Sequence, residues 1–117
     1  MPTIRDLVAT VRQFDGVDAA VVLGRDGLLI DIEANATLDG EKVAAQVPSI
    51  AQFCDELGAA AEIGALQTAI LEHDRGTAVL AAMSADVVLL VLLRPDSNVG
   101  ALVYDLRRHR ASLAALV

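Results

Sequence analysis

Seven consecutive apolar residues, at positions 87–93, limit most strongly what this chain can fold into. The segment reads Val-Val-Leu-Leu-Val-Leu-Leu, without the alternation of apolar and polar residues that marks a strand with one face in water. A strand that is apolar on both faces belongs at the centre of a sheet that is covered on both sides. The segment is also much shorter than the roughly 20 residues that cross a bilayer. We therefore expect a central strand, and no insertion into a membrane.

Four other segments have the composition or alternation of strands and are bounded by turn residues. They are residues 17–23, 28–33, 66–72 and 77–82. The first two flank Gly-Arg-Asp-Gly at positions 24–27, and Asp-Gly between two strand-like segments favours a hairpin. Positions 73–76 and 83–86 supply turn residues between the later strands. Consecutive hairpins predict an antiparallel sheet.

Three segments repeat apolar residues at the spacing of an amphipathic helix. They are residues 4–14, residues 39–61, where Asp39 can cap the helix, and the stretch from about Ser97 to the end. The predicted order is helix, strand, strand, helix, strand, strand, strand, helix. This order predicts an α+β fold, an α/β sandwich in which helices pack on a central five-stranded antiparallel sheet. With 117 residues and no linker or repeat, we expect one domain spanning 1–117.

The middle segment, residues 39–61, has an unusual distribution of side chains for a surface helix. One apolar stripe is expected to face the sheet: Val43, Val47, Ile50, Cys54, Leu57 and Ala61. The opposite side carries some charge but also short or uncharged residues: Ala45, Pro48, Gln52 and Ala59. We interpret this as a helix that packs on two sides, on its own sheet and on a partner. Pro48 is expected to kink it, because an interior proline removes a hydrogen bond and clashes with the preceding turn.

The composition supports a surface that a partner covers. Hydrophobic residues make up 55% of the chain without glycine, whereas typical soluble domains reach about 45–50% with glycine included. The formal net charge of −7 argues against nucleic acid or an anionic membrane as the main partner, because both require a basic surface. The single cysteine allows no internal disulfide, and the first residues do not resemble a signal peptide. We expect a cytoplasmic protein.

The succession of these features resembles the roadblock/dynein light-chain family. The features are the N-terminal amphipathic helix, Gly-Val-Asp-Ala-Ala-Val-Val-Leu at 16–23 followed by Arg-Asp-Gly-Leu at 25–28, the alanine-rich middle helix, the Arg-Gly turn at 75–76 and Asn-Val-Gly at 98–100. The resemblance covers nearly the whole chain, which looks like the short, MglB-like bacterial form. It implies a roadblock/profilin-like sheet of five antiparallel strands, with the middle helix on one face and the terminal helices on the other.

The resemblance also implies how such a protein works. Members of the family form homodimers or family heterodimers by pairing the middle helix and an adjoining edge strand, here residues 39–61 and 66–72. Nine residues are therefore predicted to contact the partner: Ala45, Pro48, Gln52, Phe53, Glu56, Ala59, Leu66, Thr68 and Ile70. Family members bind or regulate Ras-like small GTPases, by stimulating hydrolysis or remodelling the switch loops, or serve as subunits of motor and signalling assemblies.

The residue types that carry catalysis do not form a recognisable constellation. Cys54 falls on the apolar stripe, where a thiol behaves as a small hydrophobe, and the two histidines are far apart in sequence. Arg25 and Arg75, both in predicted hairpin turns, are the candidates for contact with a GTPase, since an arginine can act in trans. We expect no catalytic residue, metal or cofactor. A structural subunit of a larger assembly and a small ligand-sensing domain are the alternatives, and the low aromatic content disfavours the second.

Overall fold

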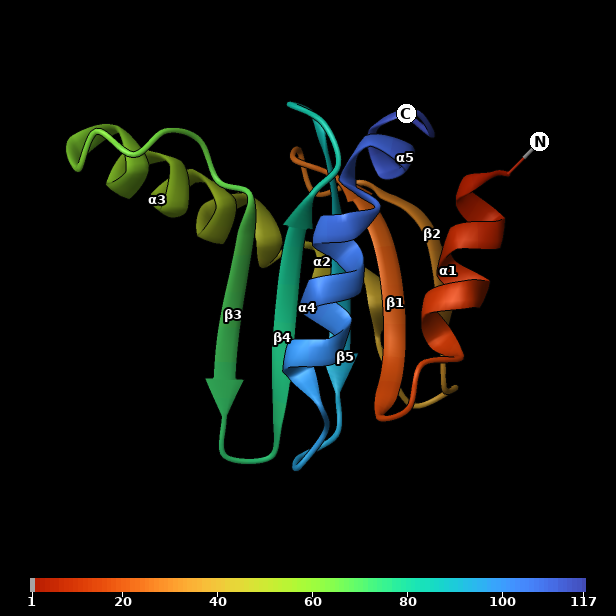
Figure 1. Cartoon of the computed structure of the whole chain (residues 1–117). Helices are drawn as coiled ribbons and strands as arrows, with labels where there is room; N and C mark the ends of the chain where they lie inside the picture. The colour runs from red at the N-terminus through yellow and green to blue at the C-terminus, as the bar shows by residue number, and fades with distance from the viewer. Residues whose placement is uncertain (1) are drawn as a thin grey trace.

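The apolar segment at 87–93 is the central strand of the sheet in the computed structural model, which describes residues 2–117. This strand, β5 (Val87–Leu93), is the middle member of a five-stranded antiparallel sheet with the order β2-β1-β5-β4-β3 (Figure 1). The other strands are β1 (Val17–Gly24), β2 (Leu29–Ala34), β3 (Thr68–His73) and β4 (Gly76–Ala82). The predicted α+β fold is confirmed. Of the predicted domain span, Met1 lies outside the described residues.

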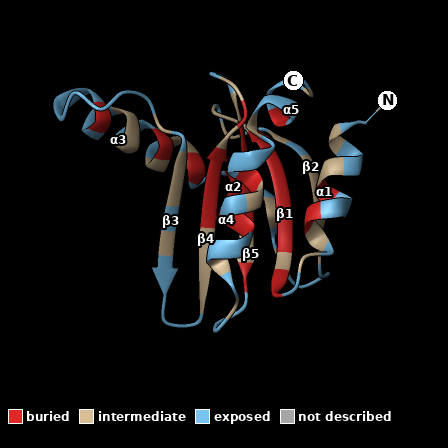
Figure 2. Ribbon diagram, in the orientation of Figure 1, coloured by how far each residue is buried: buried red, intermediate tan, exposed pale blue. Residues whose placement is uncertain are grey.

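Helices cover both faces of the sheet. α1 (Ile4–Arg12), α4 (Val99–Arg108) and α5 (Arg110–Ala114) lie on one face, and α2 (Gly40–Ala44) and α3 (Val47–Ala60) lie on the other (Figure 1). The sheet has a hydrophobic core on each face, and neighbouring residues of β5 belong to different cores. Leu89 packs under the terminal helices, and Val88 packs under α2 and α3. The central strands are therefore apolar on both faces, and Figure 2 shows them buried along most of their length.

Side-chain caps fix where several helices begin. Thr3 and Asp6 form a reciprocal capping box at the start of α1, with hydrogen bonds of 2.9 and 3.1 Å. Asp39 accepts a hydrogen bond from the backbone of Lys42 and caps α2, as predicted. Asn98 caps α4 in the same way.

The single helix predicted for residues 39–61 is wrong, because the chain forms two helices separated at Ala45 and Gln46. Pro48 lies in the first turn of α3, where a backbone N–H has no acceptor within the helix. Proline costs little at that place, and it marks the beginning of a second helix instead of a kink inside one. The predicted final helix is likewise divided, at His109, into α4 and α5.

α3 extends past the edge of the sheet that β3 forms (Figure 1). Its first half is seated on the sheet through Val47 and Ala51, which are buried. The predicted sheet-facing stripe is wrong at Leu57 and Ala61, which are exposed. The reason is that, within residues 2–117, the sheet ends at β3 and no strand lies beneath the outer turns of α3.

The chain turns back tightly after α3 to reach β3. The N–H groups of Ile63 and Gly64 both donate to the carbonyl oxygen of Gly58, at 2.9 and 3.3 Å. A Cβ atom at Gly58 would overlap the carbonyl oxygen of Gly64, so only glycine permits this contact. Gly64 has a φ of +92°, which glycine adopts without strain. These two glycines fix the direction in which the end of α3 leads into the edge strand.

Candidate partner-binding surface

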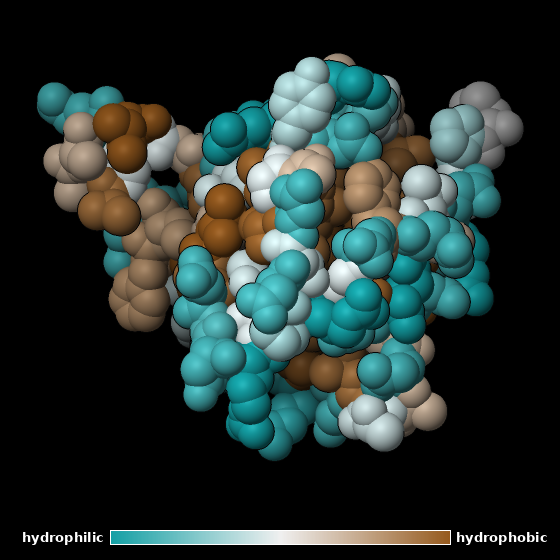
Figure 3. All heavy atoms as spheres, turned by 60° about the horizontal axis from the view of Figure 1, so that its bottom comes forward, coloured by the Kyte–Doolittle hydropathy of each residue, from teal (hydrophilic) through white to brown (hydrophobic). Residues whose placement is uncertain are grey.

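Large apolar side chains are exposed on the outer part of α3 and on the loop that follows it. The exposed fractions are 68% for Phe53, 66% for Leu57 and 77% for Ile63. Figure 3 shows apolar residues gathered on the projecting helix at the left of the view. We call these three residues the overhang patch. Exposed apolar patches are common where proteins bind other molecules, so the overhang patch is a candidate contact surface.

β3 lies beside the overhang patch and forms one edge of the sheet. Among the strands of the described residues it pairs with β4 alone, in an uninterrupted register from Thr68 opposite Ala81 to His73 opposite Gly76. Ile70, at its middle, is half exposed. An unpaired strand edge is a template on which another strand can add. The overhang patch and the free edge of β3 therefore form one candidate surface for a partner.

The nine predicted contact residues fall at several places along this surface. Four of them, Pro48, Gln52, Glu56 and Ala59, line a shallow hollow of about 420 Å³ along α3. Phe53 belongs to the overhang patch, whereas Ala45 lies in the break between the two helices and is exposed. The remaining three lie just before β3 or on it: Leu66, Thr68 and Ile70. The structure thus gathers eight of the nine on α3 and at the β3 edge.

Two residues of the overhang patch were missed by the sequence analysis. Leu57 was assigned to the sheet-facing stripe, and Ile63 lies beyond the predicted helix. A signal for Leu57 is present in the sequence, because it follows Phe53, a predicted partner contact, by four positions and so shares its side of the helix. What the sequence does not contain is the place where the sheet ends beneath the helix.

Arg25, one of the two candidate GTPase contacts, is held inside the chain. Its guanidinium forms an ion pair with Asp55 on α3, and the other carboxylate oxygen of Asp55 accepts a hydrogen bond from the N–H of Leu66 at 2.8 Å. The hydrogen bond from Leu66 holds the pKa of Asp55 below its ordinary value of 3.8, and the hydrogen bond from Arg25 lowers it further. This arrangement ties the β1–β2 turn, α3 and the segment before β3 together. Arg25 therefore positions the helix that carries the overhang patch.

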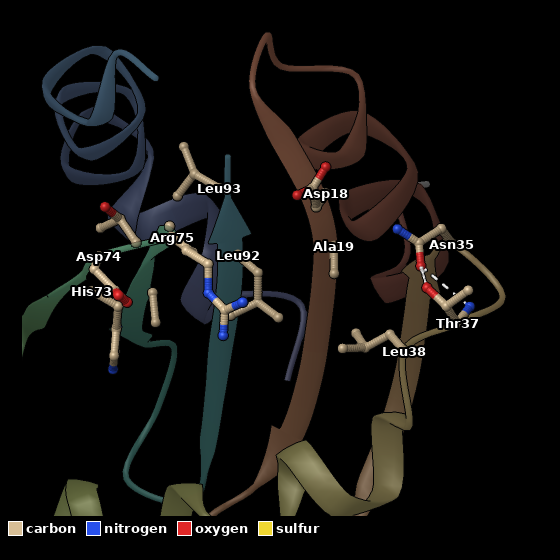
Figure 4. A pocket seen from close by; sticks show the side chains of 13 residues that line it. Asp18, Ala19, Asn35, Thr37, Leu38, His73, Asp74, Arg75, Leu92 and Leu93 are labelled. Carbon is tan, nitrogen blue, oxygen red and sulfur yellow. Dashed lines mark hydrogen bonds between the residues drawn. The ribbon is translucent and has the colours of Figure 1, made fainter. Parts of the chain in front are cut away.

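Arg75, the other candidate, lies in the β3–β4 turn and lines a separate hollow of about 490 Å³ (Figure 4). Its side chain extends over the sheet near Leu92, while Asp18 and Thr37 line the opposite side of the hollow. Arg75 forms no ion pair with any residue between positions 2 and 117. Its guanidinium is available to a carboxylate of a partner.

The cysteine and the two histidines lie in different parts of the fold. Cys54 is partly buried on α3. The imidazole nitrogens Nδ1 of His73 and His109 lie 3.0 and 2.9 Å from backbone carbonyl oxygens. Within residues 2–117, no group of three or more histidine, cysteine, aspartate or glutamate side chains is placed to hold a metal ion. None of the helices in the same part of the chain has the length and apolar character needed to cross a membrane.

Solved structures identify the class to which this arrangement belongs, an α+β sandwich of the roadblock/LC7 type. The roadblock/LC7 domain of Streptomyces avermitilis matches with a TM-score of 0.84 at 17% identity, over 97% of each chain. MglB of Myxococcus xanthus matches with a TM-score of 0.82 at 12% identity, over 92% of this chain and 88% of that one. The gliding protein MglB of Thermus thermophilus matches with a TM-score of 0.83 at 13% identity, over 96% and 86%. The chain therefore has the roadblock/LC7 fold, and the resemblance seen in the sequence is confirmed at the level of the fold.

The likeness to these proteins is low at the level of sequence. No protein-family model and no curated protein sequence matches it.

Proposed function

We propose that this chain is a non-catalytic module that forms a homodimer through α3 and β3, and that the pair regulates or scaffolds a Ras-like small GTPase. The overhang of α3 carries the proposal. A helix that leaves the sheet of its own chain exposes Phe53 and Leu57 directly beside a free strand edge.

A second copy of this chain fits the surface because it supplies the missing strand. If the β3 edge of one copy meets the β3 edge of the other, the sheet continues beneath the overhanging turns of both helices. A two-fold axis makes the arrangement reciprocal, so each α3 covers part of its partner and is covered in return. The same contact would then bury the exposed apolar side chains and give the unpaired backbone groups hydrogen-bond partners.

The GTPase part of the proposal has its support in the resemblance to the roadblock family and in the likeness to MglB structures. A module that binds and remodels the switch loops of a GTPase needs no catalytic side chain of its own. Arg75 is the candidate contact, because its guanidinium is unpaired within residues 2–117 and is presented by a turn at the sheet end. Arg25 is engaged by Asp55 and contributes by holding α3 in place.

The first experiment measures the mass of the protein in solution by light scattering at micromolar concentration. We expect twice the chain mass of 12.2 kDa. A monomer at this concentration would contradict the proposal, because the overhang patch would then be exposed permanently.

The second experiment mixes the dimer with Ras-like small GTPases loaded with GDP or with a GTP analogue, and measures binding, hydrolysis and nucleotide exchange. We expect a complex that prefers one nucleotide state, and a binding affinity that falls about 10-fold in Arg75→Ala. Arg94→Ala, at an exposed arginine after β5, is the matched control and is expected to bind normally. A changed rate indicates a regulator, whereas a complex without a changed rate indicates a scaffold. Absence of any complex would contradict the GTPase assignment.

A further inference from the structure

The free edge of β3 presents the backbone groups of alternate residues. The N–H of Ala82 donates to the carbonyl oxygen of Gln67 at 2.9 Å, and from there hydrogen-bonded and non-hydrogen-bonded pairs alternate along the β3–β4 register. The odd-numbered residues of β3 therefore direct their N–H and C=O groups toward β4. Thr68, Ile70 and Glu72 direct theirs outward, where a second strand can pair with them.

The side chains of these same residues lie on the face that carries the terminal helices. Their cross-strand neighbours show this, since Ala81 opposite Thr68 and Val79 opposite Ile70 belong to the core under α1 and α4. Arg110 of α5 reaches the same face, where its Nη2 donates to Thr68 Oγ1 at 3.1 Å. Arg110 forms no ion pair with its own chain within residues 2–117. A partly buried guanidinium thus lies at the free edge without a carboxylate.

Few registers can join two β3 strands across a two-fold axis, because only outward-facing residues can exchange backbone hydrogen bonds. With Ile70 on the axis, Thr68 of each copy lies opposite Glu72 of the other, and all three outward residues are paired. With Leu71 on the axis, Glu72 lies opposite Ile70 and Thr68 is left unpaired. With Ala69 on the axis, Glu72 extends past the beginning of the opposing strand. The register centred on Ile70 pairs the most backbone groups and places no carboxylate against an apolar side chain.

We propose that two copies pair β3 with β3 in the register that places Ile70 on the two-fold axis, and that Arg110 of each copy forms an ion pair with Glu72 of the other. Residues directly opposite each other in such a pair have Cβ atoms about 4.5–5.5 Å apart. Glu72 of the second copy, opposite Thr68, is therefore within reach of the guanidinium that binds the Thr68 hydroxyl. Two chains that each carry a formal charge of −7 repel one another. The proposed pairs of Arg110 with Glu72, one on each side of the axis, would offset part of this repulsion.

A charge-swap experiment tests the ion pair, which rests on the proposed dimer. Dissociation constants are measured by sedimentation for the wild type, Glu72→Arg, Arg110→Glu and the double variant. We expect each single variant to raise the dissociation constant about 10-fold, and the double variant to return within about 3-fold of the wild type. The matched control combines Glu72→Arg with Arg107→Glu, an exposed arginine in the last turn of α4, and is not expected to restore affinity.

A disulfide experiment tests the register directly. Ile70→Cys, Leu71→Cys and Ala69→Cys are each made in a Cys54→Ser background and oxidised. In the proposed register, residue 70 lies opposite itself with Cα atoms about 5.5 Å apart, within the range that a disulfide spans. We expect Ile70→Cys to form the covalent dimer and the other two to form it poorly, because residues 69 and 71 lie opposite each other.

The outcomes separate this register from the dimer itself. A wild-type dimer in which residue 69 or 71 cross-links best, or in which the double charge swap fails to restore affinity, would overturn the register and leave the dimer standing. A monomeric wild type would remove the proposed dimer, and the register with it. Preferential cross-linking at residue 70 together with restored affinity would support both.

Discussion

The two edges of the sheet are strands of equal length, but they differ in how readily another strand can pair with them. β2 and β3 each contain six residues. The register of β2 against β1 shifts between Val22 and Leu23, and Asp31 of β2 is tied to α1 by an ion pair with Arg5 at 2.9 Å. β3 pairs with β4 without a shift, and α3 extends over its free side.

The comparison shows that apolar exposure alone does not identify a binding surface. Leu28, beside β2, is 69% exposed, which is close to the 66% of Leu57 on α3. The difference lies in the backbone around them. A bulge and inward-tied charges blunt an edge against added strands, whereas a regular ladder leaves it open. We conclude that β2 is a protected edge and β3 an open one.

The largest expected effect tests the difference between the two edges at their exposed apolar side chains. Leu57→Glu should abolish the proposed dimer at micromolar concentration, because an unpaired charge would enter the proposed apolar contact. Leu28→Glu introduces the same charge at a matched exposure beside the protected edge, and it should leave the dimer mass unchanged. Light scattering on both variants provides the measurement. If both variants dissociate, or if neither does, the two edges do not differ in the way that we infer.

A second prediction separates the two sides of β3. Ile70→Pro should prevent dimerisation with little loss of folding stability, because the N–H of Ile70 faces outward and proline removes no hydrogen bond to β4. Leu71→Pro removes an N–H that faces β4, and it should destabilise the fold itself by about 3 kcal/mol. Circular dichroism during thermal unfolding and light scattering distinguish these results. A loss of folding in Ile70→Pro equal to that in Leu71→Pro would contradict the backbone assignment of the edge.

The same contrast explains how much could be predicted from the sequence. The strands were predicted closely because their signals are local, as in the unbroken apolar segment of β5 and the Asp-Gly turn before β2. The sequence predicts a kink near Pro48 where the structure has a break between two helices. A proline that kinks one helix and a proline in the first turn of a second helix look the same in the sequence.

The overhang could be predicted only in part. Small and uncharged residues on the outer side of α3 indicate a second packing surface, but Leu57, which the helical spacing predicts to be covered by the sheet, is exposed. Which turns of a helix lie beyond a sheet depends on where the sheet ends, and that is set by strand order and not by helix periodicity. The Arg25–Asp55 ion pair also depends on the arrangement of the elements in space, because it joins residues thirty positions apart, and local sequence patterns do not predict it.

A third prediction alters the loop that returns from α3 to the open edge. Gly58→Ala should destabilise the fold by about 1–3 kcal/mol, because the added Cβ meets the carbonyl oxygen of Gly64 and the loop must shift. Gly100→Ala in α4 is the matched control, since its Cβ would meet only Asn98 Oδ1 at an ordinary 3.6 Å. That change should be neutral or stabilise the protein by up to about 1 kcal/mol. Chemical unfolding of both variants is the measurement, and equal effects would show that the return loop tolerates a side chain at Gly58.

The smallest expected effect concerns the ion pair that orients α3 toward the open edge. The pKa of Asp55 is held below 3.8 in the folded chain, by the hydrogen bond from Leu66 and then by Arg25. A carboxyl group with a depressed folded-state pKa stabilises the fold above its unfolded-state pKa, and this contribution is lost as the pH falls through the folded-state pKa. Asp55→Asn should therefore lower the Tm slightly at neutral pH, and the difference from the wild type should shrink as the pH falls below about 3.8.

Glu56→Gln, at the next position of α3, controls for the loss of one exposed negative charge. Thermal unfolding of the wild type and of both variants from pH 7 downward provides the comparison. Equal Tm values for the two variants at neutral pH would show that the Arg25–Asp55 pair contributes nothing beyond net charge. A deficit that belongs to Asp55→Asn and fades in acid would show that the ion pair stabilises the fold. Because the pair joins the β1–β2 turn to the segment before β3, this deficit would link the orientation of α3 to the open edge.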